Sequence, residues 1–172
     1  MQKSCFGQRM PSSRKKAIAR KLTQEWVAGY LPVNGLVREA RVEMLGLDGK
    51  VQQIGADELK WICYVRDFNS GEAENPERLL RKTFAGRPRS EGVMLRLKLK
   101  DGDVIEGLAA NDASLVSGDG IFLIPPDVRS NTQRIWVPRT AIEGLEVAAV
   151  IGATKRRQTP EVAADRQEKL FP

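Results

Sequence analysis

The sequence predicts an all-β fold of two tandem five-stranded small barrels with flexible basic termini, and three observations support this prediction. The first is a clear β-hairpin in the second half of the chain. The second is a glycine inside that hairpin's returning strand, at a place where it would bend the strand. The third is the same order of elements in the first half of the chain, and such internal repetition indicates two copies of one small structural unit.

The hairpin covers residues 95–108. Residues 95–100 read LRLKLK, and strict alternation of apolar and polar side chains is typical of a strand with one buried face. Asp101-Gly102 follows and predicts a tight turn, because glycine adopts positive φ without steric cost. Residues 104–108 read VIEGL and form the returning strand. Gly107 predicts a bend in it, and a long strand bent at glycine is how a small sheet curls toward a barrel.

A second copy of this pattern lies in the first half of the chain. Residues 26–30 (WVAGY) align with residues 104–108 (VIEGL), so that the two glycines coincide. A third strand is expected at residues 40–45 in the first copy and at residues 120–124 in the second. Each copy therefore has a hairpin, a bent strand and a further strand in the same order.

The most informative match is a shared spacing of three apolar residues near the end of each copy. The second apolar residue lies five positions after the first, and the third lies three positions later still. These residues are Ile54, Leu59 and Ile62 in the first copy and Val137, Ile142 and Leu145 in the second. Each set lies where a fourth strand would end, a single helical turn would follow and a fifth strand would begin. The unit is roughly fifty to sixty residues long.

The repeat divides the chain into five segments. A linker with Gly71, Pro76, Gly86 and Pro88 separates the copies, and a short helix is expected within it at 76–82 because proline is tolerated at a first helical turn. The segments are a basic disordered arm (1–16), the first barrel (17–68), the linker (69–91), the second barrel (92–151) and a flexible basic tail (152–172).

Composition bounds the function. The chain has 172 residues, no histidine and two cysteines, so the usual general base and the commonest metal ligand are missing. Cys5 and Cys63 lie in unlike contexts, and two distant cysteines cannot make a zinc site. We expect no enzyme activity, no metal and no cofactor. No apolar run reaches membrane-spanning length, and the basic N-terminus has no apolar core, so we expect a cytoplasmic protein with reduced thiols.

The net charge of +6 is concentrated at the ends of the chain. Residues 1–21 contain seven basic residues and no acid, and residues 152–172 contain five basic and three acidic residues. Between them, residues 22–151 contain 16 basic and 19 acidic residues. The basic isoelectric point therefore reflects basic arms on a slightly acidic body.

The strand, turn, bent strand, third strand and the segment VPRTAIEGLEV (137–147) together resemble the Sm-like small barrel, a strongly bent five-stranded SH3-type sheet. Residues 17–151 also resemble an uncharacterised bacterial family of tandem Sm-like barrels. The pieces that carry this resemblance are LKWICYVRDF (59–68), ERLLRKTFAGRP (77–88) and GIFLIPPDVRSNTQRIWVP (120–138). The resemblance implies the fold, and the family has no firmly assigned biochemical activity.

The RNA-contact residues of Sm proteins do not carry over to this chain. Sm proteins that hold uridine-rich RNA resemble one another in an Asp…Asn pair after the second strand and an Arg-Gly pair after the fourth. Here Asp112 has no Asn in the expected place after it. The Arg-Gly positions hold Pro138-Arg139 in the second copy and Gly55-Ala56 in the first. Ring-type Sm recognition of RNA is therefore not favoured.

Basic side chains provide the candidate nucleic-acid contacts, because clustered Lys and Arg release condensed counterions from a polyanion. An alternative for the arm is that it is a solubilising tail. Another is that an upstream start codon extends a protein that begins near Met10. Those in the linker alternatively lie on a solvated connector. The candidates are Arg14, Lys15, Lys16, Arg20, Lys21, Arg78, Arg81, Lys82 and Arg139.

The C-terminal tail contains a candidate partner motif. Gln167, Leu170 and Phe171 have the Gln-x-x-Leu-Phe spacing, which resembles the short motif that docks bacterial polymerases and repair proteins on the DNA sliding clamp. Leu170 and Phe171 would fill an apolar pocket, and Gln167 would supply a directional hydrogen bond. The alternatives are that Leu170 and Phe171 pack back on a barrel, or that the match is accidental.

The tryptophans admit two interpretations. Trp61 and Trp136 lie next to Lys60 and Arg134, and aromatic side chains beside basic ones hold single-stranded nucleic acid by stacking. For Trp26 as for the other two, however, core or inter-barrel packing is the favoured interpretation in a protein with few aromatic residues.

The sequence therefore favours a non-catalytic, nucleic-acid-associated adaptor that contacts RNA or DNA through its basic arms without sequence preference. The alternative is a protein–protein or regulatory module whose barrel edges bind a peptide, another barrel or a second copy of the chain. PilZ barrels, which bind a cyclic dinucleotide, are a variant of this alternative. Residues 111–118 (NDASLVSG) approach the PilZ motif, but the glycine is one residue late and the paired arginine motif is absent.

Overall fold

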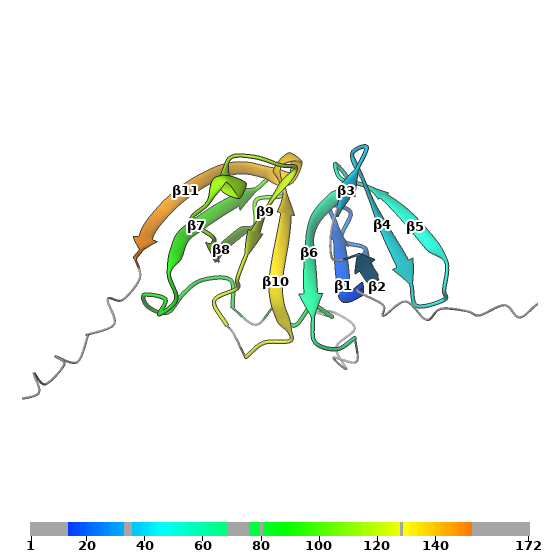
Figure 1. Ribbon diagram of the computed structural model, residues 1–172, viewed down its shortest axis with the longest axis horizontal. Coiled ribbons are helices and arrows are strands. Elements are labelled where there is room, and N and C mark those ends of the chain that lie inside the picture. Colours follow the sequence, from blue (N-terminus) through cyan, green and yellow to red (C-terminus); the bar gives the residue numbers. More distant parts are fainter. Residues whose placement is uncertain (1–13, 33–35, 69–75, 80, 128, 153–172) are drawn as a thin grey trace, which may run out of the picture.

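The computed structural model describes residues 14–32, 36–68, 76–79, 81–127 and 129–152, and these are built almost entirely of antiparallel strands (Figure 1). The only described helices are two single 3₁₀ turns, η1 (Ala113–Leu115) and η2 (Arg139–Ala141). The predicted all-β class is confirmed. None of the helices in this part of the chain has the length and apolar character needed to cross a membrane.

The first half of the chain contributes six strands. They are β1 (Arg14–Lys21), β2 (Trp26–Pro32), β3 (Val37–Arg38), β4 (Arg41–Gly46), β5 (Val51–Gly55) and β6 (Leu59–Val65). The second half contributes β7 (Gly92–Leu99), β8 (Val104–Ala109), β9 (Gly120–Leu123), β10 (Thr132–Pro138) and β11 (Ile142–Ile151). β1 begins inside the segment expected to be a disordered arm, because Arg14 to Lys16 pair with the end of β2.

The two halves pair their strands in the same order. In the first half, β5 pairs with β4, β4 with β2, β2 with β1 and β1 with β6. In the second half, β10 pairs with β9, a single bridge from Leu108 to Ile124 joins β8 to β9, and β7 pairs with both β8 and β11. Among the described strands, β5 does not pair with β6, nor β10 with β11, so hydrogen bonding does not close either expected barrel.

The bending glycines occupy the same register position in the two halves. Gly29 lies opposite Ala17, and Gly107 lies opposite Leu95. A Cβ atom added at Gly29 would lie 2.5 Å from the Leu45 carbonyl oxygen, and one at Gly107 would lie 2.6 Å from the Cβ of Leu123. Both glycines therefore let the next strand cross the bent strand closely, as the sequence predicted.

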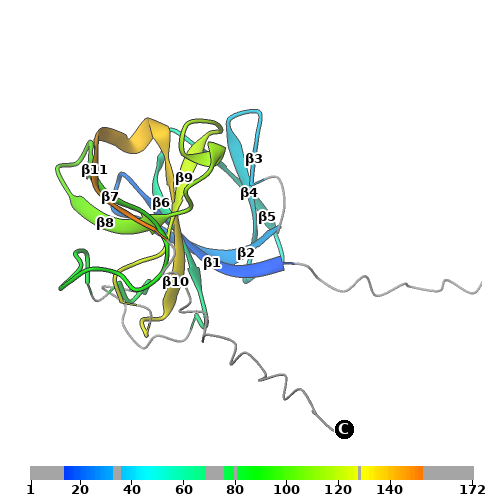
Figure 2. The same ribbon diagram turned by 60° about the vertical axis from the view of Figure 1, so that its left-hand side comes forward.

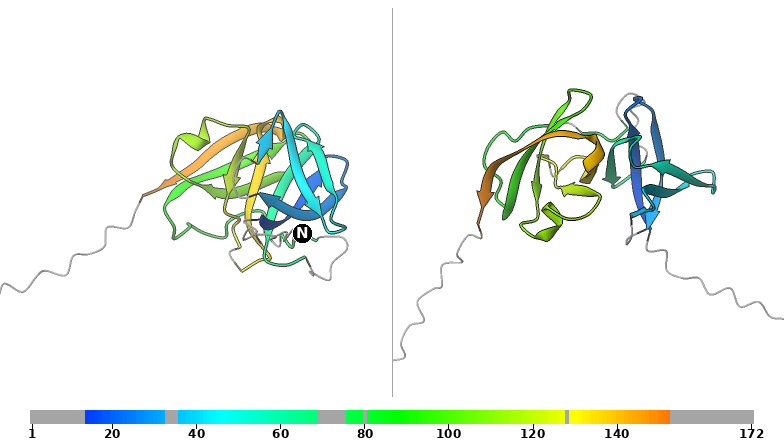
Figure 3. Two further views of the ribbon diagram at one scale, coloured as in Figure 1. Left: turned by 45° about the vertical axis from the view of Figure 1, so that its right-hand side comes forward. Right: turned by 90° about the horizontal axis from the view of Figure 1, so that it is seen from above.

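A pairing between β6 and β10 joins β9 and β10 of the second half to the six strands of the first half in one eight-stranded sheet. The other strands of the second half, β7, β8 and β11, form a three-stranded sheet. Figures 1 and 2 show these two strands side by side where the halves meet, and the view from above in Figure 3 shows the halves on either side of this junction. Tyr64 lies opposite Arg134, and Ile62 lies opposite Trp136. The junction is thus made by main-chain hydrogen bonds and not by side chains alone.

Two apolar cores lie on opposite faces of this junction. Cys63 of β6 and Ile135 of β10 face the core of the second half, whereas Ile62 and Trp136 face the core of the first half. Each junction strand therefore contributes side chains to both cores, because successive residues of a strand point to opposite faces. This double burial orients the two halves on each other.

The helix expected at 76–82 is not formed in the described residues 76–79 and 81–91. Glu77 and Leu79 are buried, and Thr132 of β10 donates a hydrogen bond to the Glu77 carbonyl. Arg78 has a φ of 47°, which a right-handed helix excludes. The linker therefore packs as an irregular segment against the junction, and this tertiary packing outweighs the local helix signal.

Candidate nucleic-acid interface

A row of aromatic and basic side chains runs across four strands at the junction of the two halves. Phe122 lies on β9, Arg134 on β10, Tyr64 on β6 and Lys15 on β1. Arg134 is directly opposite Tyr64, while Tyr64 is opposite Ala17, two residues from Lys15. Residues paired across strands, or two apart along one, share a face of the sheet. All four side chains of this junction row therefore point to the same side.

The contacts within the junction row are close. The guanidinium carbon of Arg134 lies 4.0 Å from the ring centroid of Phe122, a cation–π geometry. The rings of Tyr64 and Phe122 have centroids 6.2 Å apart and are tilted by 41°. Phe122 and Tyr64 are half-buried, while Arg134 and Lys15 are exposed. The row thus combines fixed aromatic faces with cations that water can reach.

The junction row lines a pocket of about 500 Å³. The other lining residues are Glu91, Leu108, Ala109, Ala110, Leu123, Ile124 and Gln133. This volume lies within the range usual for small-molecule and cofactor sites, about 300–1,000 Å³. Apolar walls and a few polar groups give the pocket the character of a surface that accepts a flat, partly apolar ring.

The charge at this pocket is positive overall. The lining contains two cations, Lys15 and Arg134, and one acid, Glu91. Neither cation forms a salt bridge with another residue in the described part of the chain. Burial raises the pKa of Tyr64, and the nearby Arg134 partly opposes this rise, so the phenol stays neutral at pH 7 and can donate or accept a hydrogen bond.

A profile described as a family of unknown function, DUF6982, matches residues 13–149. The chain belongs to the DUF6982 family. The matched segment includes both halves and every residue of the junction row, and it ends before the tail motif at 167–171. No curated protein and no solved structure gave a match.

The structure places the predicted basic residues of this DUF6982 chain in several separate locations. Lys15 is brought into the junction row, whereas Arg14 points to the opposite face of β1 and lines a different pocket. Lys16 pairs with Asp67 at 3.3 Å. The described arm residues, 14–16, therefore do not form one continuous basic patch.

Arg20 and Lys21 are largely committed to partners. The Arg20 guanidinium donates to the Gln24 side chain at 3.1 Å and lies 4.0 Å from the Glu77 carboxylate. Lys21 lies 3.6 Å from Glu25 and 3.8 Å from Glu58. These pairs hold the end of β1 to the neighbouring turns.

The linker cluster Arg78, Arg81 and Lys82 is likewise divided. Lys82 Nζ donates to both carboxylate oxygens of Asp103, at 2.8 and 2.7 Å. Arg78 is half-buried and Arg81 is exposed. Because Lys82 is paired with Asp103 and Arg78 is partly enclosed, Arg81 is the member of this cluster that is exposed and forms no ion pair in the described part of the chain.

Arg139 has a structural role. Its Nε donates to the Gly118 carbonyl at 3.0 Å and its Nη2 to the Leu115 carbonyl at 2.6 Å. These bonds fasten the η1 loop to η2 and use two of the five guanidinium donors. Gln167, Leu170 and Phe171 lie outside the described residues.

The tryptophan prediction holds for two of the three residues. Trp61 and Trp136 are 5% and 3% exposed. Trp26 is 45% exposed at the start of β2, because β2 begins at the rim of the sheet, opposite Arg20. The aromatic residues of the junction row, Tyr64 and Phe122, were not singled out from the sequence, since only the cross-strand register brings them together.

Proposed function

We propose that this DUF6982 protein is a non-catalytic, nucleic-acid-associated adaptor whose junction row stacks bases of single-stranded RNA or DNA. The observation that carries the proposal is the alternation Phe122–Arg134–Tyr64–Lys15 across four adjacent strands. Stacking platforms of this kind are sequence-tolerant, because every base has a π-face. Lys15 and Arg134 would meet the phosphates of the same strand.

The basic ends of the chain would add to this contact. Residues 1–21 hold seven basic residues and no acid, and each phosphate that they neutralise steepens the dependence of binding on salt. The buried Cys63 is a poor nucleophile because burial raises the pKa of its thiol, with Glu77 adding to the rise. We therefore propose a binding role in the cytoplasm and no chemistry.

Fluorescence anisotropy with labelled single-stranded RNA, single-stranded DNA and duplex DNA tests this function. The full chain is compared with a protein trimmed to residues 14–152 at two salt concentrations. We expect the trimmed protein to bind single strands more weakly and with a smaller salt slope. Loss of all binding on trimming would place the contact in the arms alone, and preference for duplex DNA would contradict a stacking platform.

For the fold, we propose that each half is an Sm-like small barrel. This proposal is supported by the strand order shared by the two halves and by the bends at Gly29 and Gly107. It adds a fold family to the all-β sheets described above, in which β5 does not pair with β6 nor β10 with β11. A solved structure of the full chain would test it.

A second candidate function is self-association through the barrel edges, as a protein–protein interaction module. The outer edges of β5 and β11 are unpaired among the described strands. They carry exposed apolar side chains, with Val51 60%, Leu145 46% and Val147 55% exposed. An unpaired edge with apolar side chains is a template for another strand.

The internal junction supplies the register for this association. Equivalent positions of the two halves are 83 residues apart, as Ile54 is from Val137 and Ile62 from Leu145. In the internal junction, Arg134 of β10 lies opposite Tyr64 of β6. The equivalent pair between two chains is Val51 in β5 of one chain and Val147 in β11 of the other. Gln53 then takes the place of Trp136. Because Gln53 is polar, we expect this contact to be weaker than the internal one and reversible.

The tail motif remains a proposal for the partner. Gln167, Leu170 and Phe171 would recruit the DNA sliding clamp and so bring the adaptor to replicating or repaired DNA. A peptide of residues 160–172, tested for direct binding to purified clamp by calorimetry, distinguishes this from an accidental match. The alanine double variant at Leu170 and Phe171 is the control.

A further inference from the structure

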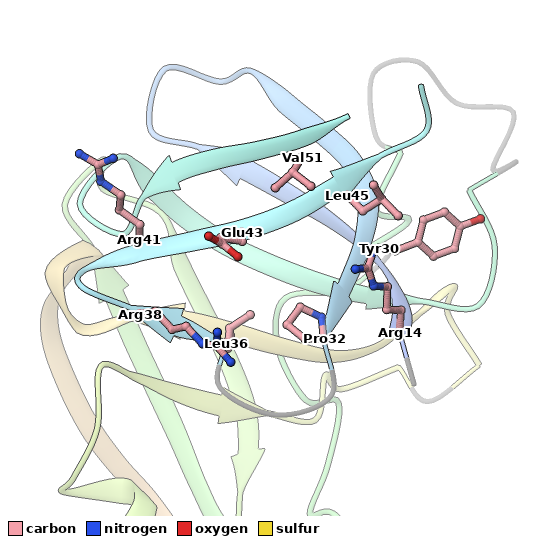
Figure 4. Close-up of a pocket in the computed structure, with 9 residues that line it drawn as sticks. All are labelled: Arg14, Tyr30, Pro32, Leu36, Arg38, Arg41, Glu43, Leu45 and Val51. Carbon is pink, nitrogen blue, oxygen red and sulfur yellow. The ribbon is translucent and has the colours of Figure 1, made fainter. Parts of the chain in front are cut away.

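A small pocket on the first half of the chain is lined by arginines (Figure 4). Its volume is about 230 Å³. β4 runs along it, with Arg14 and Tyr30 toward one end and Arg38 toward the other (Figure 4). The lining residues are Arg14, Tyr30, Pro32, Leu36, Arg38, Arg41, Glu43, Leu45 and Val51.

Two of these arginines lie directly opposite each other. Arg38 of β3 and Arg41 of β4 form a cross-strand pair, and like charges in that position are destabilising. The two residues that connect them, Glu39 and Ala40, both have positive φ, 49° and 60°. This left-handed region disfavours side chains, and hairpin turns of this kind usually contain Asn and Gly. The hairpin therefore accepts backbone strain and places two cations at opposed positions of its strands.

The charge of the pocket is not balanced by its surroundings. Glu43 is the only acid in the lining, and its carboxylate accepts a hydrogen bond from the Gln53 amide at 3.1 Å. The same Gln53 accepts a hydrogen bond from Arg41 at 3.1 Å. Arg14 and Arg38 form no salt bridge or side-chain hydrogen bond with other residues in the part of the chain that the structure describes.

We propose that this pocket binds a phosphate group, with Arg38 as its principal ligand and Arg14 as the cation at the far end. The Arg41 side chain points away from Arg38 (Figure 4) and donates to Gln53. A planar guanidinium presents paired donors that match phosphate oxygens. The pocket is smaller than the usual 300–1,000 Å³ of small-molecule sites, so it accepts a phosphate group and not a whole nucleotide.

This site does not depend on the nucleic-acid platform. Arg14 and Lys15 are adjacent in β1 and point to opposite faces of the strand, and they line different pockets. The phosphate could come from a free anion such as pyrophosphate or from the 5′ end of a nucleic acid. The two sources share the same chemistry at the arginines.

Thermal unfolding of the full chain with and without 10 mM pyrophosphate tests the site. We expect pyrophosphate to raise the melting temperature of the wild type by about 3 °C, as a ligand of about millimolar affinity would. Arg38→Gln and, separately, Arg14→Gln should lose most of this shift. Arg89→Gln, at an exposed linker position, and Arg134→Gln, in the junction row, should retain it.

The anion-free protein gives a second readout. Arg38→Gln removes one of two opposed like charges, so we expect its melting temperature without pyrophosphate to equal or exceed that of the wild type. An equal pyrophosphate shift in wild type and Arg38→Gln, or no shift in the wild type, would overturn the proposal. So would a lower melting temperature for Arg38→Gln without anion, because the arginine would then be a structural residue.

Short oligonucleotides with and without a 5′-phosphate identify the source of the group. A several-fold gain in affinity from the 5′-phosphate that Arg38→Gln abolishes and Arg134→Gln preserves would assign the site to nucleic-acid ends. A pyrophosphate shift without any effect of the 5′-phosphate would assign it to a free anion. Either result separates failure of this site from failure of the platform.

Discussion

Trp136 of β10 lies directly opposite Ile62 of β6, and both side chains belong to the core of the first half although Trp136 comes from the second. This pair makes each half part of the other's interior. The two halves of this DUF6982 chain are therefore expected to unfold as one unit.

Truncation of Trp136 tests this coupling. Trp136 is 3% exposed, and removal of a buried tryptophan side chain costs about 3–5 kcal/mol. We expect Trp136→Ala to lower the free energy of unfolding by this amount in urea titration while the transition stays single. Trp26→Ala, at a position 45% exposed, should change it by about 0.5 kcal/mol or less. Two separate transitions in the wild type would contradict the coupling.

The bending glycines should not tolerate a methyl group. Alanine at Gly107 would place its Cβ 2.6 Å from the Cβ of Leu123, and such overpacking costs about 1–3 kcal/mol. Gly29→Ala meets the Leu45 carbonyl at 2.5 Å and should behave likewise. Gly86→Ala, where nothing lies within 4 Å, should be neutral or slightly stabilising. Equal stability of all three variants in urea would show that the bends do not need glycine.

A charge cluster beside the linker should make stability depend on acid. The buried Lys60 ammonium lies 2.5 Å from Asp101 and 3.0 Å from Asp103. Burial acts to raise the pKa of Asp103, but hydrogen bonds from Lys82 and Lys60 outweigh it, so that this pKa falls below the ordinary 3.8. Since the folded value lies below the unfolded one, the stabilisation is full above about pH 5 and is lost as the pH falls through and below 3.8.

Asp103→Asn measures this contribution. We expect it to reduce stability at pH 7 by about 1–3 kcal/mol, because it removes an ionic hydrogen-bond partner of a buried lysine. The difference from wild type should shrink as the pH falls below about 3.8. Asp119→Asn, at an exposed position, is the control. A difference that is constant from pH 7 to pH 3 would show that the carboxylate charge is not responsible.

Self-association can be tested by complementation between two variants. Val51→Lys disables the β5 edge and Val147→Lys disables the β11 edge, so each protein alone should be monomeric in sedimentation analysis. An equimolar mixture retains one intact edge of each kind and should form heterodimers and nothing larger. Assembly of the wild type that Val147→Lys abolishes and Val51→Lys leaves unchanged would point to β11 pairing with itself and would contradict the proposed register.

The sequence predicted the strands well because their signals are local. Alternation at 95–100, the turn at Asp101-Gly102 and the matched Gly29 and Gly107 all act within a few residues. The pairing of β6 with β10 is not local: Tyr64 and Arg134 are 70 positions apart in the chain and meet through the register of two different halves. For this reason the junction row could not be found from the sequence.

The difference at the linker has a similar cause. A helix at 76–82 was a sound local expectation, but burial of Glu77 against Trp61 and Thr132 imposes another conformation. Arg139 was predicted to contact nucleic acid, and carbonyls from the η1 loop accept two of its five donors. The sequence alone does not show which basic residues form ion pairs or hydrogen bonds in the folded protein.

The most direct test of the central proposal is the affinity of full-length Arg134→Gln for a labelled single-stranded oligonucleotide, measured by anisotropy beside Arg89→Gln. Both substitutions remove one positive charge from an exposed arginine, so the general electrostatic loss is matched. Base stacking contributes about 1–3 kcal/mol per base, and we expect Arg134→Gln to weaken binding at least about fivefold more than Arg89→Gln. Equal affinities for the two variants would contradict the account and return the nucleic-acid contact to the basic ends of the chain.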